Sequence, residues 1–151
     1  MKKKIYLASP FFNEEELKIY KDVIQRLRAR GYEVYVPQEF EIKNAWHISN
    51  QEWGRKVFEN DVKELALCDV VMTLNFGLYS DSGTAWESGF GYALGLECVQ
   101  VLCGGFNPDY SLMMINGCHK VVDVRVVENW ESDFIKFNYS NINQKLFSKR
   151  G

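Results

Sequence analysis

Short apolar runs that alternate with helical patterns constrain this fold more than any other feature of the sequence. Each run is bounded by charged or turn-forming residues, and the segments between the runs carry apolar residues at helical spacing. The runs cover residues 5–8, 33–36, 69–74, 99–102 and 121–127. Strands that alternate with helices form a parallel sheet with right-handed crossovers. The sequence therefore predicts an α/β fold with a five-stranded parallel sheet and helices on both faces.

Local signals mark where the predicted helices begin and end. Asn13 with Glu16, and Ser49 with Glu52, have the spacing of capping boxes. Gly31 follows the first helical stripe and is typical of a helix end. We expect further helices over two segments, residues 51–66 and 130–137.

One stretch, DSGTAWESGFGYALG, places two carboxylates six residues apart. Asp81 precedes a predicted helix that Ser82 can cap, and Glu87 falls in the first turns of this helix. Gly83 and Gly91 stand one turn before and after Glu87, so the carboxylate would lie in a groove with bare backbone on both sides. The alternative is that the glycines only let the helix pack closely on a sheet while Glu87 points to solvent.

Further carboxylates and aromatic residues follow the predicted strands. Asp61 lies beside the buried stripe of its helix, where it either faces the crevice or pairs at the surface with Lys63. Residues 38–50 form a polar loop after the second strand, where such sheets bind ligands. The crevice would gather Tyr6, Phe12, either Glu39 or Glu41, Asp61, Asp81 and Glu87. Paired carboxylates can cleave a glycosidic bond and aromatic rings can stack a nucleobase, while magnesium binding is the competing use.

Composition and charge exclude several classes of partner. The net charge of −2 and the pI of about 5.7 provide no basic surface for nucleic acid or an acidic membrane. The four cysteines form no CxxC pair and the two histidines leave too few partners for the usual zinc spacings, so we expect no zinc site and reduced thiols in the cytoplasm. We expect neither a signal peptide nor a membrane span. The chain would be a single domain over residues 1–151 that binds a small molecule, with a polar tail over 138–151.

The loop after the first predicted strand argues against a phosphorylated cofactor. It reads ASPFFNEEE, without glycine, and its three glutamates fall in the first turns of the next helix. These carboxylates would repel a phosphate at the helix N-terminus, which otherwise attracts one. The sequence also has neither a GxGxxG fingerprint nor a Walker loop. We therefore expect no cofactor.

Four patches of the sequence resemble the nucleoside 2-deoxyribosyltransferase family. They are IYLASPFF near the start, Asn60-Asp61, the DSGTAWESGFGYALG stretch and Ser-Leu-Met at residues 111–113. The resemblance extends in the expected order from residue 5 to about residue 124. It implies a flavodoxin-like fold and a pentosyltransferase that exchanges the base of 2'-deoxyribonucleosides with retention of configuration.

The resemblance also implies roles for the site residues. Glu87 would be the nucleophile that holds the 2-deoxyribosyl group as an ester, and Tyr6 would orient it. Asp61 and Asp81 would hold the base and the sugar hydroxyls and manage the proton of the leaving base. The expected substrate-binding residues are Phe12 near the base, Glu39 and Glu41 at the base edge, Gly83 in the groove, and Ser111 and Met113. Sites in a homo-oligomer would be completed by a neighbouring subunit.

Two departures from the family pattern leave other functions open. Ser111 stands where the transferases usually carry Asn, and it resembles the related 2'-deoxynucleoside 5'-monophosphate hydrolases. Those hydrolases tend to lack the carboxylate of Asp81, which would repel a 5'-phosphate, so an unphosphorylated nucleoside is favoured. The chain ends at residues 149–151 in Lys-Arg-Gly, where some transferases place a tyrosine in the site.

The alternative function is an N-glycosidase that hydrolyses the same bond, and a third reading is a non-catalytic flavodoxin-like binding module. Base exchange differs from hydrolysis because water must be kept away from the glycosyl ester. The aromatic candidates for this exclusion are Phe12, Trp46, Trp53 and Trp86.

Overall fold

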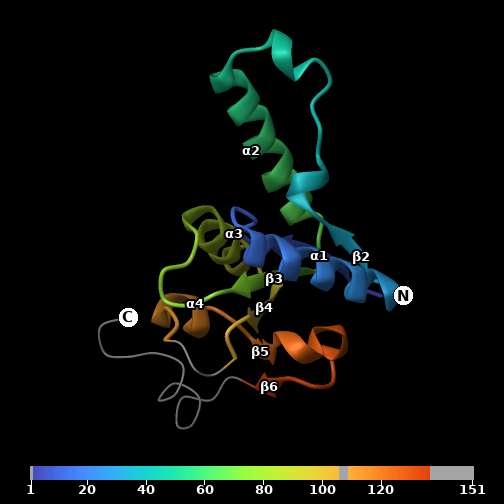
Figure 1. Cartoon of the computed structure of the whole chain (residues 1–151), viewed down its shortest axis with the longest axis vertical. Coiled ribbons are helices and arrows are strands. Elements are labelled where there is room, and N and C mark those ends of the chain that lie inside the picture. Colours follow the sequence, from blue (N-terminus) through green and yellow to red (C-terminus); the bar gives the residue numbers. More distant parts are fainter. Residues whose placement is uncertain (1, 106–108, 137–151) are drawn as a thin grey trace.

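The computed structural model describes residues 2–105 and 109–136, which form a six-stranded sheet in the order β2-β1-β3-β4-β5-β6 (Figure 1). The strands are β1 (Lys4–Ala8), β2 (Glu33–Tyr35), β3 (Val70–Asn75), β4 (Glu97–Leu102), β5 (Lys120–Asp123) and β6 (Ile135–Lys136). Neighbours among β1 to β5 pair in parallel, and β6 pairs with β5 in antiparallel. The predicted parallel sheet is confirmed, its order is flavodoxin-like, and β6 is an addition at its edge.

Helices cover both faces of the sheet. They are α1 (Glu14–Ala29), α2 (Asn50–Ala66), α3 (Ser82–Ala93) and α4 (Leu112–Asn116), with short 3-10 segments η1 (Pro37–Glu39), η2 (Ala45–His47) and η3 (Val124–Asn129). α1 and η3 pack on one face, whereas α3, α4 and the C-terminal part of α2 pack on the other. Among the described residues, no helix combines the length and the apolar character that crossing a membrane requires.

Both predicted capping boxes begin helices. The Asn13 side chain accepts a hydrogen bond of 2.9 Å from the backbone N–H of Glu16, and Ser49 accepts one of 3.1 Å from that of Glu52. The Glu16 carboxylate accepts in return from the N–H of Phe12. These bonds satisfy backbone donors that a helix start leaves unpaired.

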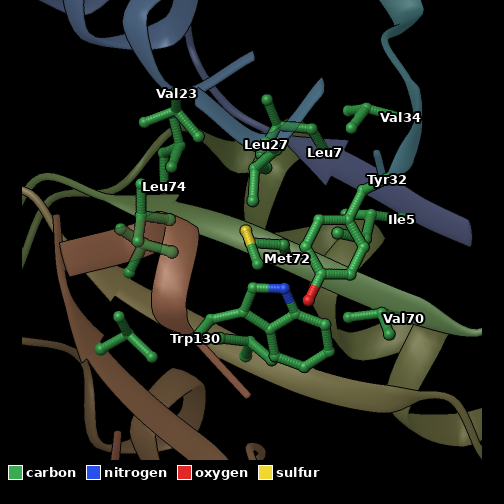
Figure 2. Packing of buried hydrophobic residues seen from close by; sticks show 14 of the residues in the cluster. Ile5, Leu7, Val23, Leu27, Tyr32, Val34, Val70, Met72, Leu74 and Trp130 are labelled. Atoms are coloured by element: carbon green, nitrogen blue, oxygen red, sulfur yellow. The ribbon is translucent and has the colours of Figure 1, made fainter. Parts of the chain in front are cut away.

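A large apolar core fills the face that α1 covers. Val23 and Leu27 of α1 pack on the strands around Met72 (Figure 2). Trp130 is fully buried in the same cluster, with its ring centroid 5.8 Å from that of Tyr32. Each fully buried side chain of this size contributes about 1.5–3 kcal/mol by leaving water. This packing holds the parallel strands in register and so places their carboxyl ends along one edge.

Polar side chains are buried beneath α3 on the opposite face. Asn75 donates to Gln100, and Gln100 donates to Ser88 of α3, each over 3.0 Å. Gly91 lets α3 approach β3 closely, because a Cβ at this position would lie 2.6 Å from a methyl group of Val71. These contacts fix the position and rotation of α3 on the sheet.

The last predicted strand is shorter than expected, and the last predicted helix does not form over its described residues. β5 ends at Asp123, whose carboxylate accepts from the N–H of Arg125 and caps η3. Over residues 130–136, the described part of the predicted helix, the chain instead forms a turn and then β6. The unpaired backbone groups at the edge of β5 are satisfied by this strand, which outweighs the helical spacing of the apolar residues. Residue 137 and the predicted tail 138–151, with its last three residues, lie outside the described residues.

α2 and the segment before it extend away from the sheet, beyond the other helices (Figure 1). The predicted loop over residues 38–50 contains η2 and most of η1. Asn44 has a φ of 60°, the left-handed conformation that asparagine tolerates better than most residues. Trp46 is 98% exposed in this segment.

Candidate active site

A cleft of about 600 Å³ lies between α2 and α3, against Tyr6 of β1. It is lined by residues from three elements: Tyr6 of β1, Trp53, Gly54, Val57, Phe58, Asp61, Val62 and Leu65 of α2, and Ser82, Gly83, Trp86 and Glu87 of α3. The structure therefore brings together Tyr6, Asp61, Gly83 and Glu87, as predicted. Glu87 lines a groove and does not simply point to solvent. One part of the alternative interpretation does hold, because Gly91 lets the helix pack closely on the sheet.

Glu87 is the most perturbed carboxyl group of the cleft. It lies in the second turn of α3, and its Oε2 accepts a hydrogen bond from the hydroxyl of Tyr6, which is fully buried. Burial raises the pKa of Glu87 to about 7, and the negative charges of Asp61 and Asp81 add to this increase. The Tyr6 hydrogen bond opposes it by favouring the ionised form. At neutral pH the group is therefore poised between acid and carboxylate.

Asp61 is held in the cleft by a tyrosine of the neighbouring strand. Its Oδ1 accepts a hydrogen bond of 3.1 Å from the hydroxyl of Tyr35. Burial raises the pKa of Asp61, and the bond from Tyr35 opposes that shift. Of the two positions that the sequence allowed for Asp61, the structure therefore has the one that faces the cleft and not the surface position beside Lys63.

Asp81 caps α3 in place of the predicted Ser82. Its Oδ2 accepts hydrogen bonds of 2.9 Å from both the backbone N–H and the hydroxyl of Thr84. The helix begins one residue earlier than the prediction, so Ser82 is its first residue and lines the cleft instead. Asp81 itself is outside the cleft lining and acts on Glu87 through its charge.

Three other predicted residues are not in this cleft. Glu39 forms two hydrogen bonds of 2.7 and 3.0 Å with Arg28 of α1, which hold it on a different surface. Glu41 lines a separate shallow hollow together with Lys56. Phe12 is 72% exposed and its ring packs on that of Phe11. The sequence interpretation grouped them because all three follow strands, but the loops diverge from the strand ends.

Ser111 and Met113 line a second hollow of about 630 Å³, which involves a different face of α3. This hollow also contains Ser88 and Tyr92, and Met113 is 75% exposed. Within one chain, Ser111 and Met113 therefore do not join the cleft of Glu87.

The aromatic lining was only partly anticipated. Trp53 and Trp86 line the cleft as expected, whereas exposed Trp46 does not. Phe58 was missed, and its ring lies 5.4 Å from that of Trp86 in an edge-on arrangement. Tyr35, which lies outside the lining but donates a hydrogen bond to Asp61, was also missed, although its place two residues before Pro37, at the carboxyl end of a predicted strand, was a usable signal.

The cleft combines a buried carboxyl group with a second carboxylate and an apolar wall. A carboxylate in this setting can attack an electrophilic carbon, and a neighbouring carboxyl can exchange a proton with the leaving group. Within residues 2–105 and 109–136, no group of three or more His, Cys, Asp or Glu side chains is arranged to hold a metal ion.

Comparison with known proteins identifies the family of this chain. The sequence matches the nucleoside 2-deoxyribosyltransferase family over residues 5–117, most of the chain. The chain belongs to this family. A solved 2-deoxyribosyltransferase from the psychrotolerant bacterium Bacillus psychrosaccharolyticus is 34% identical, with a TM-score of 0.76 over 89% of this chain and 99% of that chain. The resemblance and the fold predicted from the sequence motifs are confirmed.

Two further solved structures share the transferase fold at lower identity. A conserved protein from Enterococcus faecalis V583 is 19% identical, with a TM-score of 0.56 over 97% of this chain and 100% of that chain. A 2-desoxiribosyltransferase from Leishmania mexicana is 21% identical, with a TM-score of 0.51 over 67% of this chain and 65% of that chain. At these identities the likeness concerns the fold alone. A comparison with curated proteins finds no match.

Proposed function

We propose that this transferase exchanges the nucleobase of 2'-deoxyribonucleosides through a covalent 2-deoxyribosyl ester on Glu87. The observation that carries the proposal is the buried Tyr6–Glu87 hydrogen bond at the wall of an aromatic cleft. Family membership supports the reaction class, because the 34% identical relative is a 2-deoxyribosyltransferase.

In the first half-reaction, ionised Glu87 attacks C1' of the deoxyribose. Tyr6 donates to Oε2, which leaves Oε1 to form the new bond to carbon. The bond between C1' and the base nitrogen breaks, and the base leaves with the bonding electrons. The carboxyl group of Asp61 supplies a proton to the leaving base.

In the second half-reaction, a nitrogen of the incoming base attacks C1' of the ester. The C1'–O bond breaks, its electrons return to Glu87, and the proton released by the new base returns to Asp61. Two successive inversions at C1' leave the configuration retained. A pKa near 7 suits Glu87 for both steps, because the group must be a nucleophile in one and a leaving group in the other.

The aromatic wall supports a planar base as the leaving group. Trp53, Phe58 and Trp86 offer ring faces and edges along the cleft. Stacking of a base against them would displace water from the ester, which favours transfer over hydrolysis. An unphosphorylated sugar fits the charge of the site, because Asp81 and the acidic first turn of α1 would repel a 5'-phosphate.

A second copy of the chain would complete the site. Ser111 and the exposed Met113 lie around the second hollow, where they are available to a neighbouring subunit. Met114 and Ile115, which follow Met113 in α4, are instead buried in the core of one chain. The four cysteine thiols are unpaired, which supports a reducing compartment such as the cytoplasm.

Product analysis tests this function. The protein is incubated with deoxyinosine or thymidine, with and without adenine, and the products are separated by chromatography. New deoxyadenosine that depends on Glu87 is the expected result. Free base and deoxyribose at a rate independent of adenine would instead establish the N-glycosidase, and no reaction of either kind would favour a binding role.

Two variants make this assay specific to the proposed nucleophile. Glu87→Ala should lower the rate at least about a thousandfold, because the covalent route is lost. Glu59→Ala is the matched control, since Glu59 is an exposed carboxylate on α2 whose nearest cation is Arg55 in the same helix. Near-normal exchange by folded Glu87→Ala protein would remove Glu87 as the nucleophile.

A further inference from the structure

Tyr35 occupies the end of β2 next to the strand that carries Tyr6. The strand register pairs Tyr6 with Tyr35 directly, and their ring centroids are 5.3 Å apart with an angle of 31° between the planes. Directly paired residues on neighbouring strands point to the same face of the sheet. Tyr35 therefore extends from the sheet toward α2, on the side of the cleft.

The Tyr35 hydroxyl takes part in a hydrogen-bond chain with one direction. The side-chain amide of Asn60 donates to it over 2.7 Å, and the hydroxyl donates to Oδ1 of Asp61 over 3.1 Å. A tyrosine hydroxyl has a single proton. Because Asn60 can only donate through its NH₂ group, the proton of Tyr35 is committed to Asp61.

Burial alone does not fix this part of α2. The helix, which is described in full, has Leu65 as its one buried residue. Figure 1 shows α2 extending beyond the sheet, and both Asn60 and Asp61 are only partly buried. The single hydroxyl of Tyr35 holds two consecutive residues of this turn, Asn60 and Asp61.

We propose that Tyr35 is a positioning residue, which holds Asp61 with its Oδ2 toward the cleft and so aligns it with the base that Glu87 displaces. The proposal rests on the base-exchange function above. It assigns Tyr35 no contact with substrate, because Tyr35 is outside the cleft lining.

The groups around Asp61 determine how much the hydrogen bond from Tyr35 affects its ionisation. Tyr6 faces it from β1, Tyr35 from β2 and Glu87 from α3, while Glu64 lies one turn along α2 and pairs with Lys4 over 3.3 Å. Burial disfavours the ionised form of Asp61, and the charge of Asp61 in turn raises the pKa of Glu87. Tyr35 is the donor that favours the carboxylate.

The first test needs no substrate. Tyr35→Phe keeps the ring packed on Tyr6 but removes the hydroxyl, and the Asp61 carboxyl is titrated by NMR, with Asp61→Asn used to assign its signal. We expect the pKa of Asp61 to rise by about one unit in Tyr35→Phe. Tyr32→Phe is the matched control, because the Tyr32 hydroxyl donates to Glu131 over 2.7 Å on another part of the surface. An unchanged Asp61 titration in Tyr35→Phe would overturn the proposal.

The second test separates positioning from stability. In base exchange, Tyr35→Phe should lower kcat about tenfold with KM changed less than about twofold, because alignment in the transition state is lost while substrate binding is kept. Tyr32→Phe should leave both constants unchanged. A kcat for Tyr35→Phe equal to that of Tyr32→Phe would overturn the positioning role. If wild-type protein exchanges no base, the proposed function fails, and the NMR titration still decides whether Tyr35 controls Asp61.

Discussion

Tyr6 and Glu87 stand 81 positions apart in the sequence and share one hydrogen bond. The sheet order makes this contact: β1 lies directly beside β3, and α3 follows β3 in the chain. The buried phenol thus reaches the second turn of α3, where it stabilises the ionised form of the carboxylate that burial disfavours.

Tyr6→Phe should shift the pH dependence of base exchange. Loss of the hydrogen bond raises the pKa of Glu87 further above its value of about 7, so a higher pH is needed to ionise the nucleophile. The acid limb of kcat/KM should move up by about one pH unit. Tyr79→Phe, at a 97% exposed position, is the control. An acid limb at the wild-type pH would show that Tyr6 does not tune Glu87.

Glu87→Gln should stabilise the protein at pH 8 and not at pH 4. The folded pKa of Glu87, about 7, lies above its reference value of 4.5, so the folded state binds the proton more tightly than the unfolded state. The contribution of Glu87 to the free energy of unfolding is therefore most favourable below about pH 4.5 and falls as the pH rises to about 7. Glutamine is neutral throughout and avoids this loss, which is about 1–3 kcal/mol.

Urea denaturation of wild type and Glu87→Gln at both pH values measures this difference. Comparing the variants at each pH cancels the titration of every other group that the substitution leaves undisturbed. An equal difference in unfolding free energy at pH 4 and pH 8 would contradict the raised pKa.

Gly91→Ala should destabilise the protein by about 1–3 kcal/mol despite the better helix propensity of alanine. The added Cβ would lie 2.6 Å from Cγ1 of Val71, so α3 must move away from β3. Val71→Ala in the same chain should recover part of the loss, which a double-mutant cycle in urea measures. Gly54→Ala is the control, because a Cβ there meets nothing within 4 Å. Equal effects at Gly91 and Gly54 would exclude the close approach.

Ser111→Asn should increase the preference for deoxynucleosides over their 5'-monophosphates. Ser111 faces the second hollow, from which a neighbouring subunit would supply it to the sugar 5'-position. The longer amide can reach a 5'-hydroxyl, whereas it leaves less space for a phosphate. The measurement is the ratio of kcat/KM for the two substrates, and we expect an increase of about tenfold, the value of one neutral hydrogen bond. An unchanged ratio would place Ser111 away from the 5'-group.

Local patterns of the sequence predicted most of the secondary structure. The apolar runs became β1 to β4, and the boxes at Asn13 and Ser49 begin α1 and α2. These signals are short-range, because a capping bond joins residues three positions apart and a buried strand needs only a few consecutive apolar residues. The last helix was wrong because its residues pair with β5, a contact that local spacing does not contain.

The motif residues were predicted with uneven success for the same reason. Glu87 lies near the start of a helix and Tyr6 lies in a strand. The regular geometry of these elements sets the direction of both side chains, and both line the cleft. Glu39 and Phe12 belong to connecting segments, whose path depends on distant partners such as Arg28. Tyr35 was missed because its hydrogen bond to Asp61 depends on the helix that passes its hydroxyl.

The sequence by itself determined the order of strands and helices, the helix starts and the carboxylates available for chemistry, since each follows from residues close together in the chain. Only the tertiary structure decided which of them meet. The bond from Tyr35 to Asp61 spans 26 positions, and the bond from Tyr6 to Glu87 spans 81. The raised pKa of Glu87 is likewise a property of the packed state, because burial between β1, α2 and α3 removes the water that would stabilise its charge.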